Sequence, residues 1–393
     1  MISDFSFTPF PQIYFGKGEF LKLPAKLKGN TKKLLIITGG SSLQKSGKLD
    51  SFTTQLQNLS ISFQCEKIAT EPSPNLIDSI VNKARESQVD KVLAVGGGSV
   101  LDAGKAIAAM IPLEDGIINY LEGVGTKSHP GDTLPYIAIP TTAGTGSEAT
   151  KNAVISSIGE NGFKKSLRHD NFIPDFAVID PELMLSCPPE LTAACGLDTI
   201  TQLLESYVST KANPITDALA FGALEKALKS FPFAVAAGSS DINARADLAY
   251  GALISGITLA NSGLGIVHGF ASPIGGFFDI PHGVVCGTLL PAATKFNIEK
   301  LKEKDDDKHR ERLNKHIKVA RILPGTAKMS DNNALDFLVK TFQSWVEQFK
   351  IPRLKTYYIC EDDFDRIIKA TGQKNNPVEL SEVDLKEILT KRL

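Results

Sequence analysis

The residues best suited to chemistry in this chain are two histidines and one aspartate, in two separate segments. His268 and His282 lie fourteen positions apart in GLGIVHGFASPIGGFFDIPHG, and the whole chain holds six histidines. Asp198 lies in the mostly apolar segment CGLDTITQLLESY, four residues before Gln202 and therefore on the same face of a helix. A buried carboxylate needs a hydrogen-bonding partner or a cation.

One carboxylate and two imidazoles, without a thiolate, are typical of a catalytic Fe(II), Zn(II) or Mn(II) site with an open position. The alternative interpretation is that each histidine is a hydrogen-bonded residue of the core or of a turn. Spacing alone does not prove convergence, but the set of Asp198, His268 and His282 favours a metal site, in which these three residues are also the predicted catalytic groups.

A run of three glycines in VGGGSVLDAGKA, residues 95–106, follows a predicted strand and opens a predicted helix. Gly96, Gly97 and Gly98 let the backbone approach a phosphate, and the helix start offers free N–H groups and the positive end of the dipole. Ser99 and Asp102 have the spacing of a capping box, so the alternative is that both simply cap the helix. Because a cap does not require three glycines, the run favours phosphate binding.

A second loop, IPTTAGTGSEAT at residues 139–150, also follows a buried run. Its hydroxyl groups, which include Thr141 and Thr142, and its glycines suit a ribose, a diphosphate or a nicotinamide amide. Taken alone, the loop fits a polar surface turn equally well. Two such loops at strand ends of one sheet together predict a dinucleotide.

The segment ITGGSSL at residues 37–43 bears on which dinucleotide binds. An acidic residue after an early strand commonly binds the ribose 2′-hydroxyl of NAD. Here the small residues Gly39, Gly40, Ser41 and Ser42 occupy that region, and no carboxylate would repel a 2′-phosphate. We expect the chain to accept NADP, with NADP preferred to NAD.

The elements that must position these residues differ between the two halves of the chain. Up to about residue 188, strand-like runs such as KKLLIITGG alternate with helical patterns, which predicts a parallel sheet with crossover helices. From about residue 190 the pattern is helical. Two prolines in SCPPE mark the boundary, so we predict an α/β domain at 1–188, an all-helical domain at 189–393, and a ligand cleft between them. The predicted helices of the second domain cover residues 190–209, 214–230, 242–261, 312–322 and 332–349.

Composition excludes several other classes of protein. The net charge of −1 gives no basic field for nucleic acid, and no uninterrupted apolar stretch approaches a membrane span in length. Five cysteines without a CxxC pair indicate neither a disulfide framework nor a zinc knuckle. The start lacks the pattern of a signal peptide, and the mixed charges at 299–312 indicate a solvated helix face or loop. We therefore expect a cytoplasmic protein that binds neither nucleic acid nor membrane.

Several motifs together resemble one known family. GGGSVLDAGKAIA, IPTTAGTGSEAT, VIDPEL, GLDTITQLLESYVS and GLGIVHGFASPIGGFFDIPHG are similar, in order and spacing, to motifs of the group III, iron-containing alcohol dehydrogenases. The similarity runs from about residue 8 to the C-terminus. It implies an α/β dinucleotide-binding domain with a parallel sheet and an all-α C-terminal domain, the architecture also of dehydroquinate synthase-like enzymes. It further implies a divalent metal in the cleft, Fe²⁺ in the first place and Zn²⁺ in the second, and a homodimer.

The resemblance also assigns roles to individual positions. The implied metal ligands are Asp198, Gln202, His268 and His282. The implied cofactor residues are the glycine loop, an aspartate near the nicotinamide, two threonines and a lysine: Gly96, Gly97, Gly98, Ser99, Asp102, Thr141, Thr142 and Lys164.

Two positions depart from the family pattern. Position 202 is Gln where most members have His, and position 272 is Ser where many have a further histidine near the substrate. A glutamine oxygen is a weaker and harder donor than imidazole, so we expect metal affinity or identity to shift. Ser272 removes a group able to relay protons. Arg168 and His169 would suit an anionic or polyhydroxy substrate, but contacts at the surface or between domains are the favoured interpretation.

The sequence thus predicts a metal-dependent, NAD(P)-linked alcohol dehydrogenase that also reduces aldehydes or ketones, with hydride passing between a metal-bound alcohol and the nicotinamide. Its partner would be a small-molecule alcohol or carbonyl compound. Three alternatives stay open: a metal-independent NAD(P)H reductase of the same superfamily, a cyclising synthase that uses NAD transiently, and a non-catalytic nucleotide-binding protein.

Overall fold

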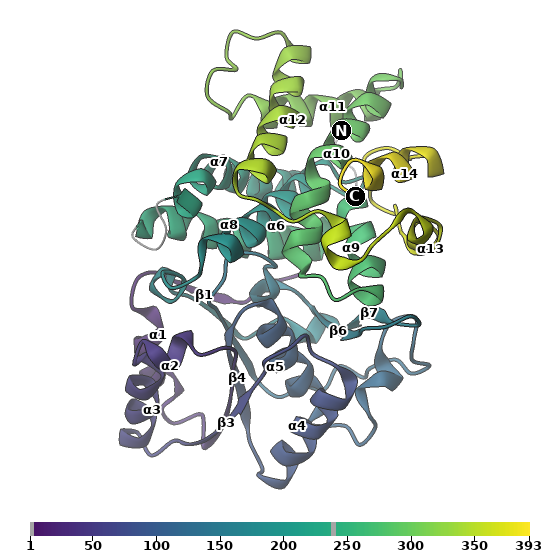
Figure 1. Ribbon diagram of the computed structural model, residues 1–393. Helices are drawn as coiled ribbons and strands as arrows, with labels where there is room; N and C mark the ends of the chain where they lie inside the picture. The colour runs from purple at the N-terminus through teal and green to yellow at the C-terminus, as the bar shows by residue number, and fades with distance from the viewer. Residues whose placement is uncertain (1–3, 237–240) are drawn as a thin grey trace.

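The computed structural model describes residues 4–236 and 241–393, which form two stacked halves (Figure 1). The N-terminal half, purple to teal in Figure 1, holds a parallel sheet and its covering helices, and the C-terminal half, mostly green to yellow, is helical. The predicted fold class, a parallel-sheet α/β domain followed by an all-helical domain, is confirmed. The chain passes from one half to the other at the start of α6 (Pro189–Val208).

The sheet has six strands, all parallel, in the order β1-β8-β5-β4-β2-β3. Because β4 pairs with β2 on one side and with β5 on the other, the loops that follow these three strands open at the same edge of the sheet. The strands are β1 (Gln12–Phe15), β2 (Lys33–Thr38), β3 (Ser62–Lys67), β4 (Lys91–Gly96), β5 (Tyr136–Pro140) and β8 (Phe176–Ile179).

Helices cover both faces of this sheet. Leu34 and Ile36 of β2 pack in one cluster with α1 and α3, whereas Leu35 and Ile37 pack in another with α4 and α5. The continuous apolar strand KLLIIT is therefore buried on both sides, as strands of a parallel sheet are. The helices of this half are α1 (Glu19–Leu27), α2 (Ser42–Lys45), α3 (Lys48–Asn58), α4 (Pro74–Glu86) and α5 (Gly98–Met110).

An antiparallel hairpin that was not predicted from the sequence follows β5. It consists of β6 (Asn152–Ser157) and β7 (Phe163–Arg168). Both strands are short and partly polar, so their apolar alternation is weak. Buried Lys105 of α5 holds the start of the hairpin, because its ammonium group donates to the carbonyls of Thr150 and Asn152 at 2.7 and 2.8 Å.

The C-terminal half follows the predicted helices closely where the apolar periodicity is strong. Two further helices, α9 and α10, form in the glycine-rich segment that carries the two histidines, where no helix was predicted. Pro273 and Pro291 lie inside them, so tertiary packing outweighs local propensity here. The helices are α6 (Pro189–Val208), α7 (Pro214–Ala236), α8 (Ile242–Ser262), α9 (Ile266–Phe277), α10 (His282–Lys302), α11 (Asp307–Ala320), α12 (Asp331–Gln348), α13 (Phe364–Ala370) and α14 (Glu382–Thr390).

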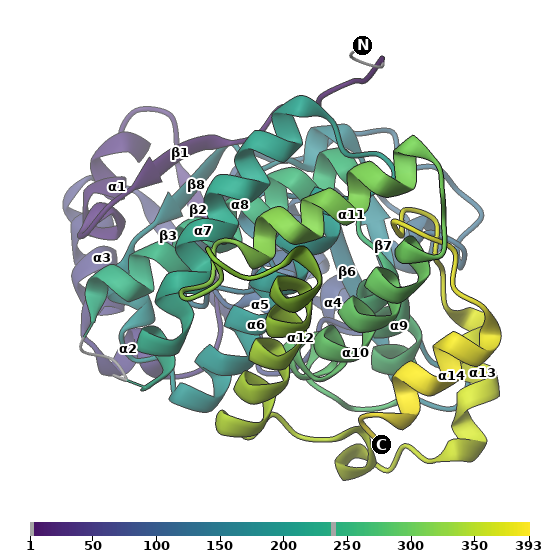
Figure 2. The same ribbon diagram turned by 90° about the horizontal axis from the view of Figure 1, so that it is seen from above.

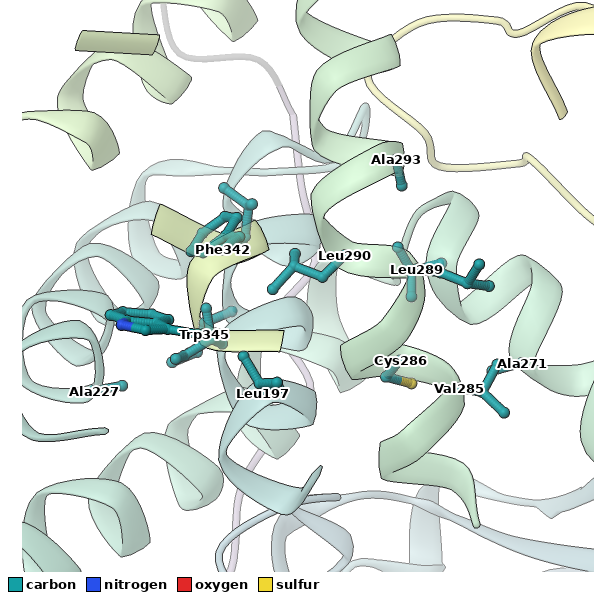
Figure 3. Close-up of a cluster of buried hydrophobic side chains, with 14 of the residues drawn as sticks. Leu197, Ala227, Ala271, Val285, Cys286, Leu289, Leu290, Ala293, Phe342 and Trp345 are labelled. Atoms are coloured by element: carbon teal, nitrogen blue, oxygen red, sulfur yellow. The ribbon is translucent and has the colours of Figure 1, made fainter. Parts of the chain in front are cut away.

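The core of the helical half lies between α6, α10 and α12. Figure 3 shows Leu197 of α6, Leu290 of α10, and Phe342 and Trp345 of α12 in one apolar cluster. Cys286, nearer the start of α10, lies at the edge of the same cluster. Seen from above, α13 and α14 lie beside α9 and α10 at the rim of this half (Figure 2).

The charged run at 299–312 forms the end of α10, a turn and the start of α11. Asp306 caps α11 by accepting the N–H of His309 at 3.1 Å. Arg310 forms exposed ion pairs with Asp305 and Asp307 at 2.6 and 2.9 Å. The run is therefore a solvated helix end and loop, as predicted.

Within the described ranges, no single helix is both long and apolar enough to cross a membrane. On length and composition only the successive helices α8 and α9, bent by 98°, pass that test as a pair.

Close packing of α10 on α6 sets the position of His282 relative to Asp198. A Cβ atom at Gly283 would lie 2.7 Å from the carbonyl oxygen of Ala194 in α6, which is closer than ordinary contact allows. Glycine at this position therefore lets the first turn of α10, which begins at His282, lie against the helix that carries Asp198.

Candidate metal centre and cofactor cleft

Four side chains of the types that bind metals converge where α6, α9 and α10 meet. Asp198 comes from α6, His268 from the first turn of α9, and His282 and Cys286 from the start of α10. One donor atom of each lies within 4.8 Å of those of the others. Asp198 Oδ1 is 3.3 Å from His268 Nε2 and 3.7 Å from His282 Nε2. Cys286 Sγ is 3.6 Å from each of these ring nitrogens.

Side chains from distant parts of the chain fix the first turn of α9, and with it His268. The N–H of Ile266 donates to Asn376 Oδ1 at 3.1 Å, and the N–H of Val267 donates to Glu205 Oε1 at 2.6 Å. These bonds satisfy N–H groups at the helix start that have no partner within the helix. Because Glu205 belongs to α6, the helix that carries the aspartate also holds the start of α9.

Glu205 also orients the ring of His268. Its Oε2 lies 2.7 Å from His268 Nδ1, so Nδ1–H donates to the carboxylate and Nε2 is directed toward Asp198. A carboxylate behind a metal-binding histidine fixes the tautomer and makes the ring a better ligand. Glu205 was not singled out from the sequence, although its place seven residues after Asp198 puts both on one face of α6.

The electrostatics of the cluster favour an ionised aspartate and a neutral His282. Burial raises the pKa of Asp198, but His282 and His268 outweigh this effect and hold the pKa at about 2. Burial lowers the pKa of His282 to about 4. Burial also acts to lower the pKa of His268, yet Cys286, Asp198 and Glu205 together raise it above its ordinary value. The cluster as a whole is suited to a positive charge.

The residues present fit a divalent cation. Asp198 Oδ1 is buried and has no hydrogen-bond partner among the described residues. Buried polar atoms are nearly always paired, so a carboxylate oxygen 3.3 and 3.7 Å from two ring nitrogens is suited to a cation shared with them. Carboxylate, imidazole and sulfur are also the ligand types of zinc and iron sites.

Gln202 lies outside this cluster. Its amide nitrogen donates to the carbonyl of Gly144 at 3.3 Å, and its oxygen accepts from Ser255 Oγ at 3.4 Å. Thr199 Oγ1 donates to the same Gly144 carbonyl at 3.1 Å. Both side chains thus tie α6 to the loop that follows β5. Of the four expected ligands, the structure brings together Asp198, His268 and His282 and directs the amide of Gln202 elsewhere.

A cleft of about 480 Å³ opens at the sheet edge where the loops after β2, β4 and β5 meet. Its far wall comes from the segment that joins the two halves, including Ser186 and Leu191. Ser41, Gly98, Asp102 and Lys164 are not among the residues that line it. The expected cofactor residues that do line it are Gly39, Gly40, Gly96, Gly97, Ser99, Thr141 and Thr142.

The glycine loop leaves no room for a side chain at Gly96 or Gly98. A Cβ at Gly96 would lie 2.5 Å from the Cβ of Val100, and one at Gly98 would lie 2.6 Å from Thr145 Oγ1. α5 begins at Gly98, and no side chain in the described part of the chain caps its first N–H groups. An uncapped helix start directly after a strand is a common phosphate-binding device.

The capping box considered for Ser99 and Asp102 is not formed, so that alternative is wrong. Ser99 Oγ donates instead to Glu71 Oε1 at 2.8 Å. Asp102 Oδ2 accepts the N–H of Val154 at 3.0 Å and thereby ties α5 to β6. Burial raises the pKa of Asp102.

Glu71 connects the glycine loop to the hairpin, and sequence reasoning missed it. Lys164 Nζ of β7 lies 3.1 Å from Glu71 Oε2, on the opposite side of the carboxylate from Ser99. Burial acts to raise the pKa of Glu71, but Lys164 outweighs it and the pKa is lowered. Ser272 Oγ of α9 donates to the carbonyl of Lys164 at 3.0 Å, so position 272 anchors the hairpin. No local spacing marks Glu71, since its partners are distant in sequence.

Arg168 and His169 form contacts away from the lining of the cleft. Arg168 pairs with the exposed Glu122 at 2.8 Å. His169 Nδ1 accepts the N–H of Asn171, and its ring lies beside Phe172. Both contacts agree with the interpretation favoured from the sequence.

Comparison with known proteins covers both halves of the chain. The family described as iron-containing alcohol dehydrogenase matches residues 11–181, and its C-terminal family matches residues 192–393. The NADPH-dependent butanol dehydrogenase of Clostridium saccharobutylicum is 30% identical across 97% of this chain and 96% of its own length. The chain belongs to the iron-containing alcohol dehydrogenase family.

Other members of the family agree in sequence and in fold. Long-chain-alcohol dehydrogenase 1 of Geobacillus thermodenitrificans is 38% identical over 72% of this chain and 71% of its own. The alcohol dehydrogenase from Oenococcus oeni, 29% identical, superposes with a TM-score of 0.88 over 99% of this chain and 100% of its own. This iron-containing alcohol dehydrogenase is therefore an oxidoreductase linked to NAD(P), as predicted, and the family implies a divalent metal.

We expect Glu205→Gln to weaken metal binding about 10–100-fold, because a carboxylate that orients a ligand histidine contributes about that much. The amide replaces one of the two carboxylate oxygens by an NH2 donor, so either Val267 N–H or His268 Nδ1–H loses the acceptor that it now has. Competition titration against a chromophoric chelator measures the affinity. Glu190→Gln, an exposed change in the same helix, is the matched control. Equal affinities of the Glu205→Gln variant and the wild type would refute the orienting role.

Proposed function

We propose that this family member interconverts alcohols and carbonyl compounds at a divalent metal held by Asp198, His268 and His282, beside a dinucleotide in the cleft. The observation that carries the proposal is the convergence of these three side chains, whose donor atoms lie within 4.8 Å of one another. Their closeness to the cleft is supported by Glu71, a lining residue whose charge acts on the pKa of His282.

When bound, a divalent ion supplies Lewis acidity to a substrate oxygen, and a nicotinamide supplies the acceptor or donor of hydride. The protein's part is to hold both reactants in contact and to limit water around them. Glu205 keeps His268 in one tautomer, and the buried position of Asp198, 1% exposed, keeps competing water away from its carboxylate. On the cofactor side, Glu71 holds Ser99 of the glycine loop against Lys164.

We infer that the cofactor is NADP in preference to NAD. The uncapped start of α5 and the hydroxyl groups of Thr141 and Thr142 are suited to the diphosphate and nicotinamide side of the molecule. Gly39 and Gly40 line the cleft at the end of β2, where a carboxylate would repel a 2′-phosphate. The name of the butanol dehydrogenase relative, which is NADPH-dependent, supports the same preference.

A small uncharged alcohol is the proposed substrate class. Relatives named for butanol and for 1,3-propanediol, the latter from Citrobacter freundii at 36% identity over 70% of both chains, support small uncharged alcohols.

The working form is proposed to be a cytoplasmic homodimer. β1 is an edge strand of the sheet, and Phe10 and Phe15 beside it are 52% and 41% exposed. An apolar edge strand left uncovered is suited to pairing with a second copy. Light scattering on the purified protein is expected to give twice the mass of the chain, and a monomer at working concentration would contradict the dimer.

Asp198→Asn is expected to lower kcat/KM for alcohol oxidation about 1000-fold or more. Losing the metal removes several kcal/mol of transition-state stabilisation, and ~1.4 kcal/mol corresponds to a factor of ten. Steady-state kinetics together with metal analysis and thermal unfolding separate loss of chemistry from loss of fold. Asp78→Asn, whose carboxylate accepts Ile117 N–H and does not line the cleft, is the control. Full activity in a rigorously metal-free preparation of the wild type would defeat the metal-dependent mechanism.

Introducing a carboxylate at the end of β2 should reverse the cofactor preference. We expect Gly39→Asp to raise KM for NADP about ten-fold or more, because like charges at short range repel by about 1–4 kcal/mol. KM for NAD should change little. Gly39→Asn is the matched control, since its Cβ meets the same Val100 methyl group, 3.0 Å away, without adding charge. Equal KM shifts for NADP in both variants would show that charge at this position does not select the cofactor.

A further inference from the structure

We propose that Cys286 is the fourth protein ligand of the metal centre, in place of a side chain at position 202. The inference rests on the proposed metal at Asp198, His268 and His282 and adds a thiolate to that set. It also leaves Gln202 free for the task that its contacts show, which is to hold the Gly144 carbonyl.

The separations around Cys286 match those of ligands around one ion. In a tetrahedral site, neighbouring donor atoms lie about 1.6 times the metal–ligand distance apart, or about 3.3–3.8 Å for bonds of about 2.0–2.3 Å. Asp198 Oδ1 lies 3.3 and 3.7 Å from Nε2 of His268 and His282. Cys286 Sγ lies 3.6 Å from both of these nitrogens. The sulfur therefore occupies a ligand position without any movement of the backbone.

The helix itself sets this position. Cys286 follows His282 by four residues on α10, so the two side chains lie one above the other on the same helix face. The packing of Gly283 against Ala194 brings that face onto Asp198 of α6. His268 then closes the group from α9, and the four donor atoms come from three helices.

Packing alone does not account for the cysteine's surroundings. A buried free cysteine commonly behaves as a small apolar residue, and Cys286 does lie at the edge of the cluster that contains Leu290 (Figure 3). Its sulfur, however, faces the two ring nitrogens and the Asp198 carboxylate rather than hydrocarbon alone.

Position 202 does not compete for the same place. Gln202 is 1% exposed, and both ends of its amide are engaged, by Gly144 and by Ser255. Turning the amide toward the cluster would leave the buried Gly144 carbonyl with Thr199 alone and Ser255 without that acceptor. Ser255 would keep its bond to the Ala252 carbonyl at 2.8 Å, so the loss would be the two contacts of the amide itself.

A thiolate changes the kind of ion that the site selects. Burial raises the pKa of the free Cys286 thiol to about 12, so a bound metal would have to displace its proton; the donor set would then carry two negative charges, which balance a divalent cation. Sulfur is a soft ligand that favours zinc and its substitute cobalt over manganese and other ions that prefer oxygen. Zinc sites can expand to five ligands, so four protein groups still leave a position for substrate.

Cobalt provides a direct test, because a thiolate bound to Co²⁺ produces an intense sulfur-to-metal absorption band in the near ultraviolet. We expect this band when Co²⁺ alone is added to the metal-free wild-type enzyme. Cys286→Ser should lose the band while visible cobalt bands report that the ion is still bound. Cys195 lies on a different helix, α6, and is outside the four-residue group. Cys195→Ser should therefore keep the band.

The outcomes separate this inference from the proposed function. Cobalt bound to the wild type without the ultraviolet band would overturn ligation by Cys286 and leave the metal site standing. No cobalt bound at all would overturn both. If Cys286→Ser does not fold, X-ray absorption of the zinc-loaded wild type decides: a sulfur atom at about 2.3 Å from zinc supports the inference, and a shell of nitrogen and oxygen alone refutes it.

Discussion

One buried carboxylate, that of Asp198 in the middle of α6, is the constraint on which the site depends. It is 1% exposed in a largely apolar helix, and an ionised group in such a place is very costly unless opposite charge or hydrogen-bond donors surround it. The chain meets this requirement with two histidines, each in the first turn of a helix that begins close to α6. Glu205 is a second buried carboxylate on the same helix, and its two oxygens are satisfied by Val267 N–H and by His268.

The same helix couples the metal ligands to the cofactor side of the cleft. From α6, Thr199 and Gln202 both donate to the carbonyl of Gly144, within the loop whose Thr142 lines the cleft. An α-helix is stiff over this length, so the distance between Asp198 and that loop is set by the helix rather than by the loop's own flexibility. Hydride transfer needs such a fixed separation, because reactivity falls steeply when the reacting atoms are misplaced by about 1 Å.

Much of this arrangement could be predicted from the sequence, because periodicity and residue type carry it. The parallel sheet followed from its apolar strands, and Asp198, His268 and His282 were grouped by ligand chemistry. The hairpin of β6 and β7 and the helices α9 and α10 could not be predicted, since contacts with distant residues stabilise them: Lys105 holds the hairpin at Asn152, and Asn376 caps α9. Glu71 has partners 28 and 93 residues away, which no local pattern reveals.

Cys286 is a different kind of omission, because its signal was present. A cysteine four residues after a candidate ligand histidine lies on the same helix face, but without a predicted α10 that spacing had no meaning. Once the helix is known, a shift of the fourth ligand from position 202 to position 286 explains Gln202 and Cys286 together. If the fourth ligand comes from α10, the side chain at position 202 need not face the metal, and an amide there can anchor the Gly144 carbonyl instead. In this enzyme, the loop beside the cofactor would therefore be held by hydrogen bonds that persist whether or not the metal is bound.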